Sequence, residues 1–409
     1  MRIIYLLTQD LDSPSGLGRY SPLARELSRR GHHVEVFALH PNLPALAETQ
    51  FELDGVGVHY VAPMHVRKAG SVKSYYPAYR LLAVAVRATW ELSRAAIRTP
   101  ADVVHIAKPH PMNSLAGLAA RALRGRRLYL DCDDDETGSG RFGAAWQQRG
   151  VAFFERRMPR AVSRITTNTL VMRQRLLESG IPPGRITYLP NGVDRQRFSP
   201  PGAGQVEAVR EELGLVGKRV VAFIGSLSLP SHPVDLLIAA FARLQAVDPQ
   251  VALLLAGGGE DLEHCRQQVQ QLGIGESVRF VGRVPPEAVR IYYHLADVSV
   301  DPVHDDAAAR GRSPLKLFES WACGTPFVTA GVGDRRQLSG DPPAALLAAP
   351  GDPPALAHAI WQILSDGELA ENLRQRGRQR VEDYYWDHLA GQLEAVYKQD
   401  ASQHSNRAV

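Results

Sequence analysis

The segment Arg310–Pro326 holds side chains that suit an anionic ligand. Ser313 and Pro314 are typical of an N-cap and a first helical turn, so we expect a helix to begin there. Lys316 and Glu319 are three residues apart and would share one face of that helix. A cation beside a helix start suits a diphosphate, and a carboxylate one turn deeper suits sugar or ribose hydroxyl groups.

Further cations lie in the same segment. Arg312 and Leu315 complete the predicted binding residues, and Arg310 adds another positive charge. The alternative is a capped surface helix whose Lys316–Glu319 pair contributes only about 0.3 kcal/mol. The chain has only six lysines, so a lysine inside a motif is informative, and Lys316 is our first candidate for a catalytic cation.

Glycine turns follow several apolar runs and give more candidate ligand contacts, because glycine lets the backbone approach a phosphate or a sugar. These turns contain Gly16 and Gly18, Gly225 with Ser226, and Gly257 with Gly258. A dinucleotide fingerprint would need a third glycine at position 21, which is Ser21, so a dinucleotide cofactor is disfavoured. Tight turns alone would explain each loop taken singly.

The elements that must position these residues alternate between short apolar strands and amphipathic helices. We expect strands at 2–7, 33–38, 103–106, 128–130, 165–167, 186–189, 220–224, 251–256, 278–281, 298–300, 326–329 and 346–347. We expect helices at 19–30, 114–123, 234–247, 261–272, 286–295 and 315–322. The Pro- and Gly-rich segment 199–204 separates two such halves. This pattern predicts an α/β protein with two Rossmann-like doubly wound parallel-sheet domains and ligands at the carboxyl ends of their strands.

Composition narrows the function. The 409 residues are 44% hydrophobic and 22% charged, as in soluble globular proteins, and the net charge of +4 is too small to indicate nucleic-acid binding. Residues 1–198 nevertheless hold 28 Lys and Arg against 17 Asp and Glu, whereas residues 199–409 hold 19 against 26. Three scattered cysteines, an early end to the N-terminal apolar run and the lack of a long apolar stretch lead us to expect a cytoplasmic protein.

Several motifs, taken in their order and spacing, resemble those of GT-B glycosyltransferases of the GT4 type, the group 1 family. Leu189–Pro200 resembles the hinge-side motif, and Leu254–Gly259 resembles a glycine loop of the donor domain. Val278–Val284 resembles the strand and loop that hold the nucleobase through backbone groups. Glu319–Pro326 resembles the helix whose Glu contacts ribose or sugar, and Tyr385–Asp387 resembles the segment that returns to the N-terminal domain.

The resemblance implies two domains facing a cleft and a retaining transfer of sugar from a nucleotide-diphosphate sugar to a hydroxyl acceptor. Residues 1–198, with a returning helix at 384–400, would bind the acceptor, and residues 199–383 would bind the donor. The implied donor contacts are Gly225, Ser226, Gly257, Gly258, Arg283, Val284, Arg312, Ser313, Pro314 and Leu315. No cofactor is implied, and a divalent metal is possible but not favoured.

The chain departs from the family pattern at three positions. Gly311 stands where the family usually has a second acid, eight residues before Glu319. Ser226 and His232 stand where a basic pair usually clamps the diphosphate, so Lys316 and its neighbouring arginines are expected to replace that charge. These departures motivate one alternative, a non-catalytic protein that binds sugar nucleotides. A second alternative is a nucleotide-sugar epimerase of the same architecture, which could use the acids of Asp131–Glu136.

Acids crowd Asp131–Glu136 after an expected strand, where family members often carry His-Asp. Like charges so close repel one another unless something neutralises them. We expect Asp133 to contact the acceptor and Asp134 to act in catalysis; the alternatives are a divalent cation site and a solvated helix cap. Lys108 and His110 end near the same edge and, with Gly16 and Gly18, are the other candidate acceptor contacts.

Basic residues recur every seven positions at Lys73, Arg80, Arg87 and Arg94, which would form one stripe on a helix. This stripe fits anionic lipid heads, or an anionic acceptor such as a lipid-linked phosphate. It also fits an ordinary solvated helix face. A peripheral position at the inner face of the membrane is therefore part of the hypothesis.

Overall fold

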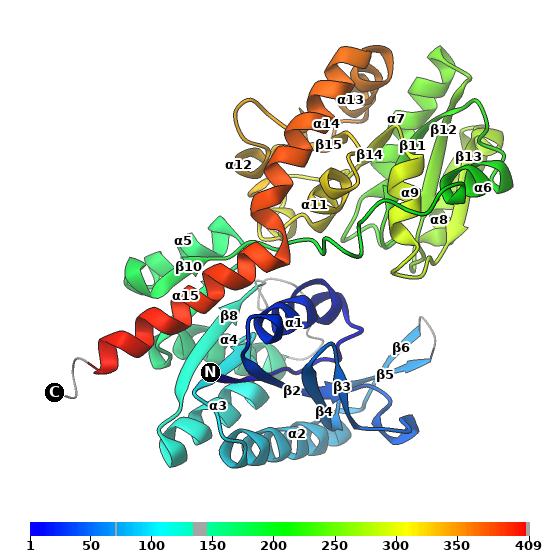
Figure 1. The fold of residues 1–409 in the computed structure, drawn as a ribbon. Helices are drawn as coiled ribbons and strands as arrows, with labels where there is room; N and C mark the ends of the chain where they lie inside the picture. The colour runs from blue at the N-terminus through cyan, green and yellow to red at the C-terminus, as the bar shows by residue number, and fades with distance from the viewer. Residues whose placement is uncertain (70–71, 134–144, 406–409) are drawn as a thin grey trace. The chain divides into compact units, whose positions relative to one another are not determined.

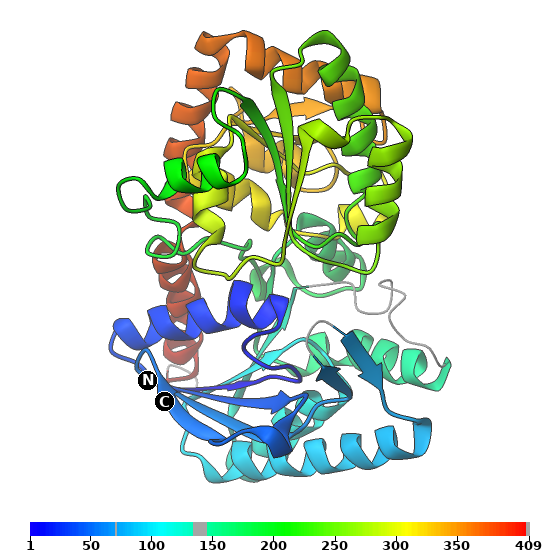
Figure 2. The ribbon, with the colours of Figure 1, turned by 90° about the vertical axis from the view of Figure 1, so that its right-hand side faces the viewer.

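The computed structural model describes residues 1–69, 72–133 and 145–405. Its chain divides into two compact units, Met1–Asn191 with Trp386–Val409 (unit 1) and Gly192–Tyr385 (unit 2). Each unit is a twisted sheet between layers of helices (Figures 1 and 2).

Unit 1 contains an eight-stranded sheet in the order β10-β9-β8-β7-β1-β2-β4-β3, parallel except for the β3–β4 pair. Its strands are β1 (Arg2–Leu6), β2 (His33–His40), β3 (Gln50–Leu53), β4 (Val56–Pro63), β7 (Val103–Ala107), β8 (Arg127–Cys132), β9 (Arg164–Thr167) and β10 (Ile186–Tyr188), beside a separate hairpin of β5 (Val66–Ala69) and β6 (Val72–Tyr75). Its helices are α1 (Ser21–Arg29), α2 (Ala78–Arg98), α3 (Pro111–Arg124), α4 (Ala145–Ala161), α5 (Leu170–Glu178) and α15 (Trp386–Ser405).

Alternation along β1 shows how this sheet buries both faces. Ile4 and Leu6 pack into a core with residues of α2 and α3. Ile3 and Tyr5 point the other way, into a core with residues of α1 and α15. Side chains of a strand alternate between faces, so a strand buried on both sides is apolar throughout, which is why this run was recognisable in the sequence.

Unit 2 contains a six-stranded parallel sheet in the order β13-β12-β11-β14-β15-β16. Its strands are β11 (Arg219–Ile224), β12 (Val251–Ala256), β13 (Val278–Gly282), β14 (Val298–Val300), β15 (Phe327–Ala330) and β16 (Leu346–Ala348). Its helices are α6 (Gln205–Glu212), α7 (Val234–Val247), α8 (Leu262–Gln271), α9 (Val289–Leu295), α10 (Ala307–Arg310), α11 (Leu315–Ala322), α12 (Arg335–Ser339), α13 (Pro353–Ser365) and α14 (Gly367–Val381).

One local prediction differs from the structure at its start, and another is wrong. The helix expected at 19–30 begins as a π-helical turn over Gly16–Tyr20 and becomes α-helical only from Ser21. The stripe that was expected to start at Lys73 is also interrupted, because Lys73 lies on β6 and α2 begins at Ala78. Only the arginines from Arg80 onward therefore share a helix.

The hairpin of β3 and β4 was missed, although its turn carries a sequence signal. Asp54 and Gly55 connect the strands with φ values of 52° and 78°. Two successive positive φ values define the turn that Asp-Gly favours between antiparallel strands. The dipeptide between Leu53 and Val56 could have predicted this edge of the sheet.

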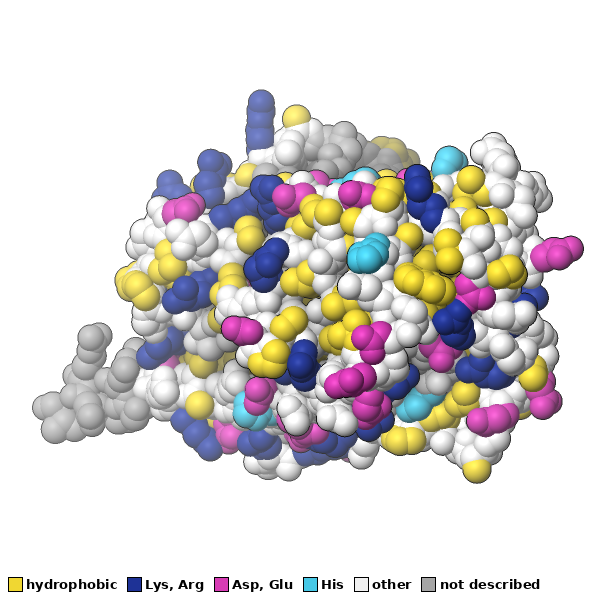
Figure 3. Space-filling model, turned by 90° about the horizontal axis from the view of Figure 1, so that it is seen from above, with side chains coloured by type: hydrophobic (Ala, Val, Ile, Leu, Met, Phe, Trp, Pro, Cys, Tyr) yellow, Lys and Arg dark blue, Asp and Glu magenta, His cyan; other side chains and the backbone are white. Residues whose placement is uncertain are grey.

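Surface charge is mixed on one side of the molecule. On the face drawn in Figure 3, acidic and basic side chains are interspersed with apolar ones. This face therefore shows no large area of a single charge sign.

Two glycine loops of unit 2 pack directly on each other. A Cβ on Gly257 would collide with the carbonyl oxygen of Gly225, and a Cβ on Gly259 would collide with that of Leu227. A Cβ on Gly258 would meet nothing within 4 Å. Gly257 and Gly259 are thus required by contact between loops, whereas Gly258 is not.

We predict that Gly257→Ala destabilises unit 2 by about 1–3 kcal/mol, because the methyl group forces the two loops apart. Gly258→Ala is the matched control and should change stability much less. Urea unfolding followed by circular dichroism measures both variants. Equal unfolding midpoints for the two variants would contradict the loop contact.

Candidate functional site

The candidate donor site lies where the strand order of unit 2 changes direction. β11 has β12 on one side and β14 on the other, so Gly225 and Asp301 leave neighbouring strands at their carboxyl ends. In open α/β sheets this switch point is where ligands bind. Helix α11 begins at Leu315 and carries Lys316 to the same place.

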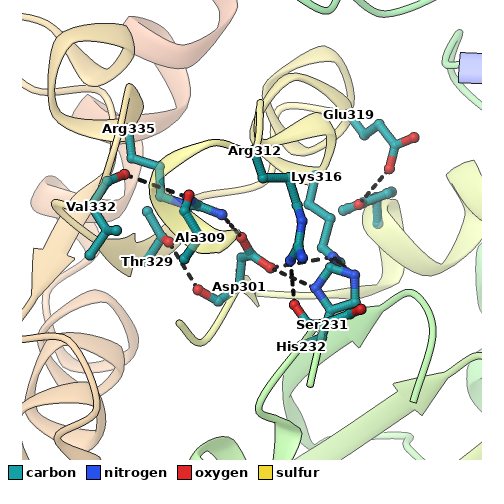
Figure 4. A network of polar contacts seen from close by, with 11 residues as sticks. Ser231, His232, Asp301, Ala309, Arg312, Lys316, Glu319, Thr329, Val332 and Arg335 are labelled. Carbon is teal, nitrogen blue, oxygen red and sulfur yellow. Dashed lines mark hydrogen bonds and ion pairs between the residues drawn. The ribbon is translucent and has the colours of Figure 1, made fainter. Parts of the chain in front are cut away.

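Asp301 is the centre of a buried ionic network (Figure 4). Its Oδ1 lies 3.3 Å from Lys316 Nζ, and its Oδ2 accepts a hydrogen bond of 2.9 Å from Arg335 Nη2. Thr329 Oγ1 donates to the Asp301 carbonyl oxygen at 2.9 Å. The carboxylate is therefore held between two cations supplied by α11 and α12.

The charges of this network follow from its burial. Burial opposes ionisation of Asp301, but Lys316 and Arg335 outweigh it and hold the pKa of Asp301 below its ordinary value. Burial also lowers the pKa of Lys316, against the pull of Asp301. The ion pair fits a carboxylate and an ammonium that compensate each other's desolvation.

His232 stands next to Lys316 and is neutral. The two nitrogens, Lys316 Nζ and His232 Nδ1, are 3.1 Å apart. Burial, and then the charge of Lys316, lower the pKa of His232 to about 3. The neutral ring accepts a hydrogen bond from the ammonium, because a protonated ring has no acceptor.

Gly225 makes room for the lysine. A Cβ at this position would lie 2.7 Å from Lys316 Cε. The ammonium also lies 5.1 Å from the centre of the Phe223 ring. A side chain at position 225 would therefore displace Lys316, the candidate catalytic cation.

The other predicted donor residues lie in the loops that follow β11, β12 and β13. Ser226 and Arg283 are exposed, and Val284 is half-buried after β13, next to Gly282, whose carbonyl oxygen accepts from Gly257 N at 2.8 Å. Gly258 lies in the adjoining loop. The structure thus brings the ends of β11, β12 and β13 together with the start of α11.

The start of α11 differs in detail from the prediction. Pro314, not Ser313, is the N-cap residue, and Ser313 is buried one residue earlier. Arg312 donates to the carbonyl oxygen of Ser231, so it ties this loop to the loop before α7. Arg310 pairs with exposed Asp305 at 2.7 Å.

Glu319 lies one turn along α11 from Lys316, as expected from their spacing. Its Oε2 accepts a hydrogen bond of 2.9 Å from the hydroxyl of buried Tyr293. Burial, and then the charge of Glu319, raise the pKa of Tyr293 well above its ordinary value, so the phenol stays a donor. One carboxylate oxygen is thereby fixed in place.

Asp301, Arg335 and Tyr293 were missed by sequence reasoning. Asp301 carried a usable signal, since an acid directly after the apolar strand β14 must lie at the ligand-binding edge of the sheet. Arg335 and Tyr293 carried none, because only tertiary packing brings them to Asp301 and Glu319.

The switch point of unit 1 lies between β1 and β7. A buried ion pair joins Arg19, which follows β1, to Asp131 near the end of β8, the strand beside β7. Arg19 Nε and Nη2 donate to the two oxygens of Asp131 at 2.6 and 2.8 Å. Its Nη1 donates to the Leu189 carbonyl oxygen and the Asn191 side chain, each at 3.1 Å. Arg19, which was not among the predicted site residues, therefore links β8 to the last residues of Met1–Asn191.

Lys108 and Asp133, two predicted acceptor residues, meet in the same region. Lys108 Nζ lies 3.2 Å from Asp133 Oδ1, and both side chains are buried. Lys108 has a φ of 66°, and the Asn113 amide donates to its carbonyl oxygen at 3.1 Å. A non-glycine residue with positive φ is held by its surroundings and often marks a functional site.

The remaining predicted acceptor residues flank this pair. Gly16 is buried, and a Cβ there would collide with the Asp10 carbonyl oxygen. Gly18 lies in the π-helical turn, and His110 is the N-cap residue of α3. Asp134 lies outside the described residues.

Within residues 1–69, 72–133 and 145–405, no group of three or more His, Cys, Asp and Glu side chains is placed to hold a metal ion. In the same described ranges, no helix is long and apolar enough to cross a membrane.

Comparison with solved structures defines the class of fold. The chain is 21% identical to sucrose-phosphate synthase from Thermosynechococcus elongatus, with a TM-score of 0.77 over 98% of this chain and 100% of that one. The two parallel-sheet units thus form a GT-B fold, as predicted.

The sequence then gives the family. Residues 15–192 match the glycosyl transferase 4-like domain, and residues 205–380 match glycosyl transferases group 1. The chain belongs to the group 1, GT4-type glycosyltransferases, which confirms the resemblance seen in the motifs.

Two curated relatives illustrate the range of the family. The D-inositol 3-phosphate glycosyltransferase of Geodermatophilus obscurus is 34% identical over 61% of this chain and 56% of its own length. The GDP-mannose-dependent alpha-(1-6)-phosphatidylinositol monomannoside mannosyltransferase of Mycolicibacterium smegmatis is 27% identical over 67% of this chain and 70% of its own. The chain thus spans little more than half the length of the first of these relatives.

The neutral state of His232 predicts an acid-sensitive fold. The folded ring, with a pKa of about 3, stays unprotonated at pH 5, whereas the unfolded ring, with an ordinary pKa of 6.5, binds a proton. Stability therefore falls as the pH drops from about 6.5 toward 3. His232→Asn should lower the number of protons taken up on unfolding at pH 5 by about one.

Urea unfolding between pH 5 and pH 7 measures the slope of the unfolding free energy against pH, which reports this proton uptake. His264→Asn is the control, because His264 is exposed on α8 of the same unit. An unchanged slope in His232→Asn would show that the ring is not kept neutral by the fold.

Proposed function

We propose that the protein is a retaining glycosyltransferase that moves a sugar from a nucleotide-diphosphate sugar to a hydroxyl group of an anionic, phosphate-bearing acceptor. Unit 2 binds the donor and unit 1 binds the acceptor. The names of the two relatives, which act on inositol phosphate and on a phosphatidylinositol mannoside, support a cyclitol phosphate or a lipid-linked form of it as acceptor. The excess of basic residues in 1–198 supports the same class.

The observation that carries this proposal is Lys316 at the switch point of unit 2. The ammonium lies beside Gly225, the glycine that follows β11, at the edge where this fold class binds ligands. Loss of the diphosphate from the sugar builds negative charge on its oxygens. A cation fixed in advance by Asp301 and His232 stabilises that charge without having to reorganise.

Glu319 positions the donor in this proposal. Tyr293 occupies one oxygen of its carboxylate, and the second accepts from a hydroxyl of ribose or sugar. Gly225, Gly257 and the loop Gly282–Val284 contribute backbone groups around the nucleotide. No step requires a cofactor or a metal ion.

The acceptor side rests on Lys108 and Asp133. An acceptor phosphate competes with Asp133 for Lys108, which releases the carboxylate toward an acceptor hydroxyl. His110 is a further acceptor residue in this proposal, and so is Asp134, which lies outside the described residues. When the acceptor is lipid-linked, the enzyme works from a peripheral position at the inner face of the membrane.

The reaction is tested by incubating the protein with nucleotide sugars and with inositol phosphate or free inositol. We expect transfer to a hydroxyl group of inositol phosphate and not to free inositol, with release of nucleoside diphosphate. Anomeric coupling constants of the product by NMR should show the configuration of the donor sugar. Binding without release would favour the non-catalytic alternative, and interconversion of nucleotide sugars would favour an epimerase.

Lys316→Met should lower kcat/KM for donor by about a hundredfold or more, because it removes a charge that acts on the leaving group. Lys218→Met is the matched control, since Lys218 precedes the opposite end of β11. Nucleoside diphosphate release measures both variants. Similar rates for both would remove Lys316 from the diphosphate site.

A further inference from the structure

Helix α2 presents a row of large apolar side chains to solvent. Tyr79, Leu82, Val86 and Trp90 are 73%, 59%, 63% and 68% exposed. Their spacing of three or four residues places them on one face of the helix. Together with Ala83 and Arg87, they line one shallow surface groove.

The opposite face of α2 is firmly packed. Ala88, Leu92 and Ala96 lie in the core that α2 shares with the sheet of unit 1. Figure 2 shows α2 along the outside of that sheet. The apolar row is therefore held in place by a fixed helix, and the described residues of this chain leave it exposed.

Arginines border this row along one side. Arg80, Arg87 and Arg94 recur every seven residues and are exposed. With Arg98, α2 carries four arginines against one acid, Glu91, which lies 3.7 Å from Arg94. The solvent-exposed side of α2 thus carries an apolar row next to a basic row.

We propose that this face of α2, defined by Tyr79, Leu82, Val86 and Trp90 with Arg80 and Arg87, docks on an anionic lipid bilayer. The helix lies in the plane of the membrane, its apolar row enters the boundary between headgroups and acyl chains, and the arginines meet lipid phosphates. Trp and Tyr favour that boundary, because their rings are amphipathic. The inference rests on the peripheral position proposed above but not on the proposed chemistry.

Charge argues for lipid over a second copy of the chain. A self-pair through α2 would bring two helices together, each with four arginines and one acid. Like charges at that contact would repel, whereas an anionic bilayer neutralises them. A membrane would contact both the arginines and the apolar row, whereas a dimer would be stabilised by the apolar row alone.

Flotation with lipid vesicles tests the proposal and needs no substrate. The full chain should float with vesicles of phosphatidylcholine and phosphatidylglycerol, and much less with phosphatidylcholine alone. Arg80→Gln with Arg87→Gln should weaken binding by about fivefold per arginine. Leu82→Ser with Trp90→Ser should weaken it about tenfold or more and abolish a blue shift of tryptophan fluorescence.

Matched controls lie in unit 2. Val216→Ser with Val247→Ser removes two apolar side chains that are 66% and 70% exposed, and Arg243→Gln with Arg266→Gln removes two exposed arginines. Both controls should float like the wild type. No flotation of the wild type at low salt, or equal flotation of the Leu82→Ser/Trp90→Ser variant, would overturn the proposal.

Sedimentation tests the other possible occupant of this face, a second copy of the chain. A dimer that Leu82→Ser with Trp90→Ser dissociates would show that a second copy covers this face, and would also overturn the proposal. Transfer to soluble inositol phosphate is unaffected by these variants if the chemistry proposed above is correct. Loss of flotation with intact transfer therefore supports the lipid surface, and loss of transfer alone counts against the proposed reaction.

Discussion

A buried carboxylate that must be neutralised organises unit 2. Asp301 follows the central strand β14 into an apolar interior, where an unpaired charge would be very costly. Lys316 and Arg335 satisfy it from two helices, and Thr329 fixes its backbone from β15. The ends of β14 and β15 and the starts of α11 and α12 are thereby fixed together, and the position of Lys316 follows from that constraint.

Unit 1 meets the same constraint at the carboxyl end of β8. Asp131 is buried at the end of β8, and its two carboxylate oxygens accept hydrogen bonds from Nε and Nη2 of Arg19. The same guanidinium also donates to the carbonyl oxygen of Leu189, just before the chain leaves unit 1. The planar, multiply donating head of arginine can do both, which a lysine could not. Each unit thus has a buried ion pair at the carboxyl ends of its parallel strands, the edge where such sheets bind ligands.

The sequence predicted the strands whose apolar runs are buried on both faces of a sheet, and it missed the β3–β4 hairpin at a sheet edge. The strand at 251–256 and the helix at 315–322 were predicted with their observed bounds, since apolar runs ending in glycine leave little choice. The β3–β4 hairpin, at the sheet edge, has exposed residues that weaken its pattern. Lys316 and Glu319 were found because their spacing is local, whereas Arg335 reaches Asp301 only through the fold. How Asp133 and Lys108 use their charges stays a prediction.

The departure at position 232 and the lysine at 316 are two parts of one arrangement. Two unit charges 3.1 Å apart would repel by about 5 kcal/mol at an effective dielectric constant of about 20. A second ammonium at position 232, where the family usually has a basic residue, would therefore drive one cation out of the network or deprotonate it. A neutral imidazole removes this repulsion and accepts a hydrogen bond instead. With Asp301 balanced against Arg335, Lys316 leaves one surplus positive charge at the switch point, in the half of the chain, 199–409, where acids outnumber bases.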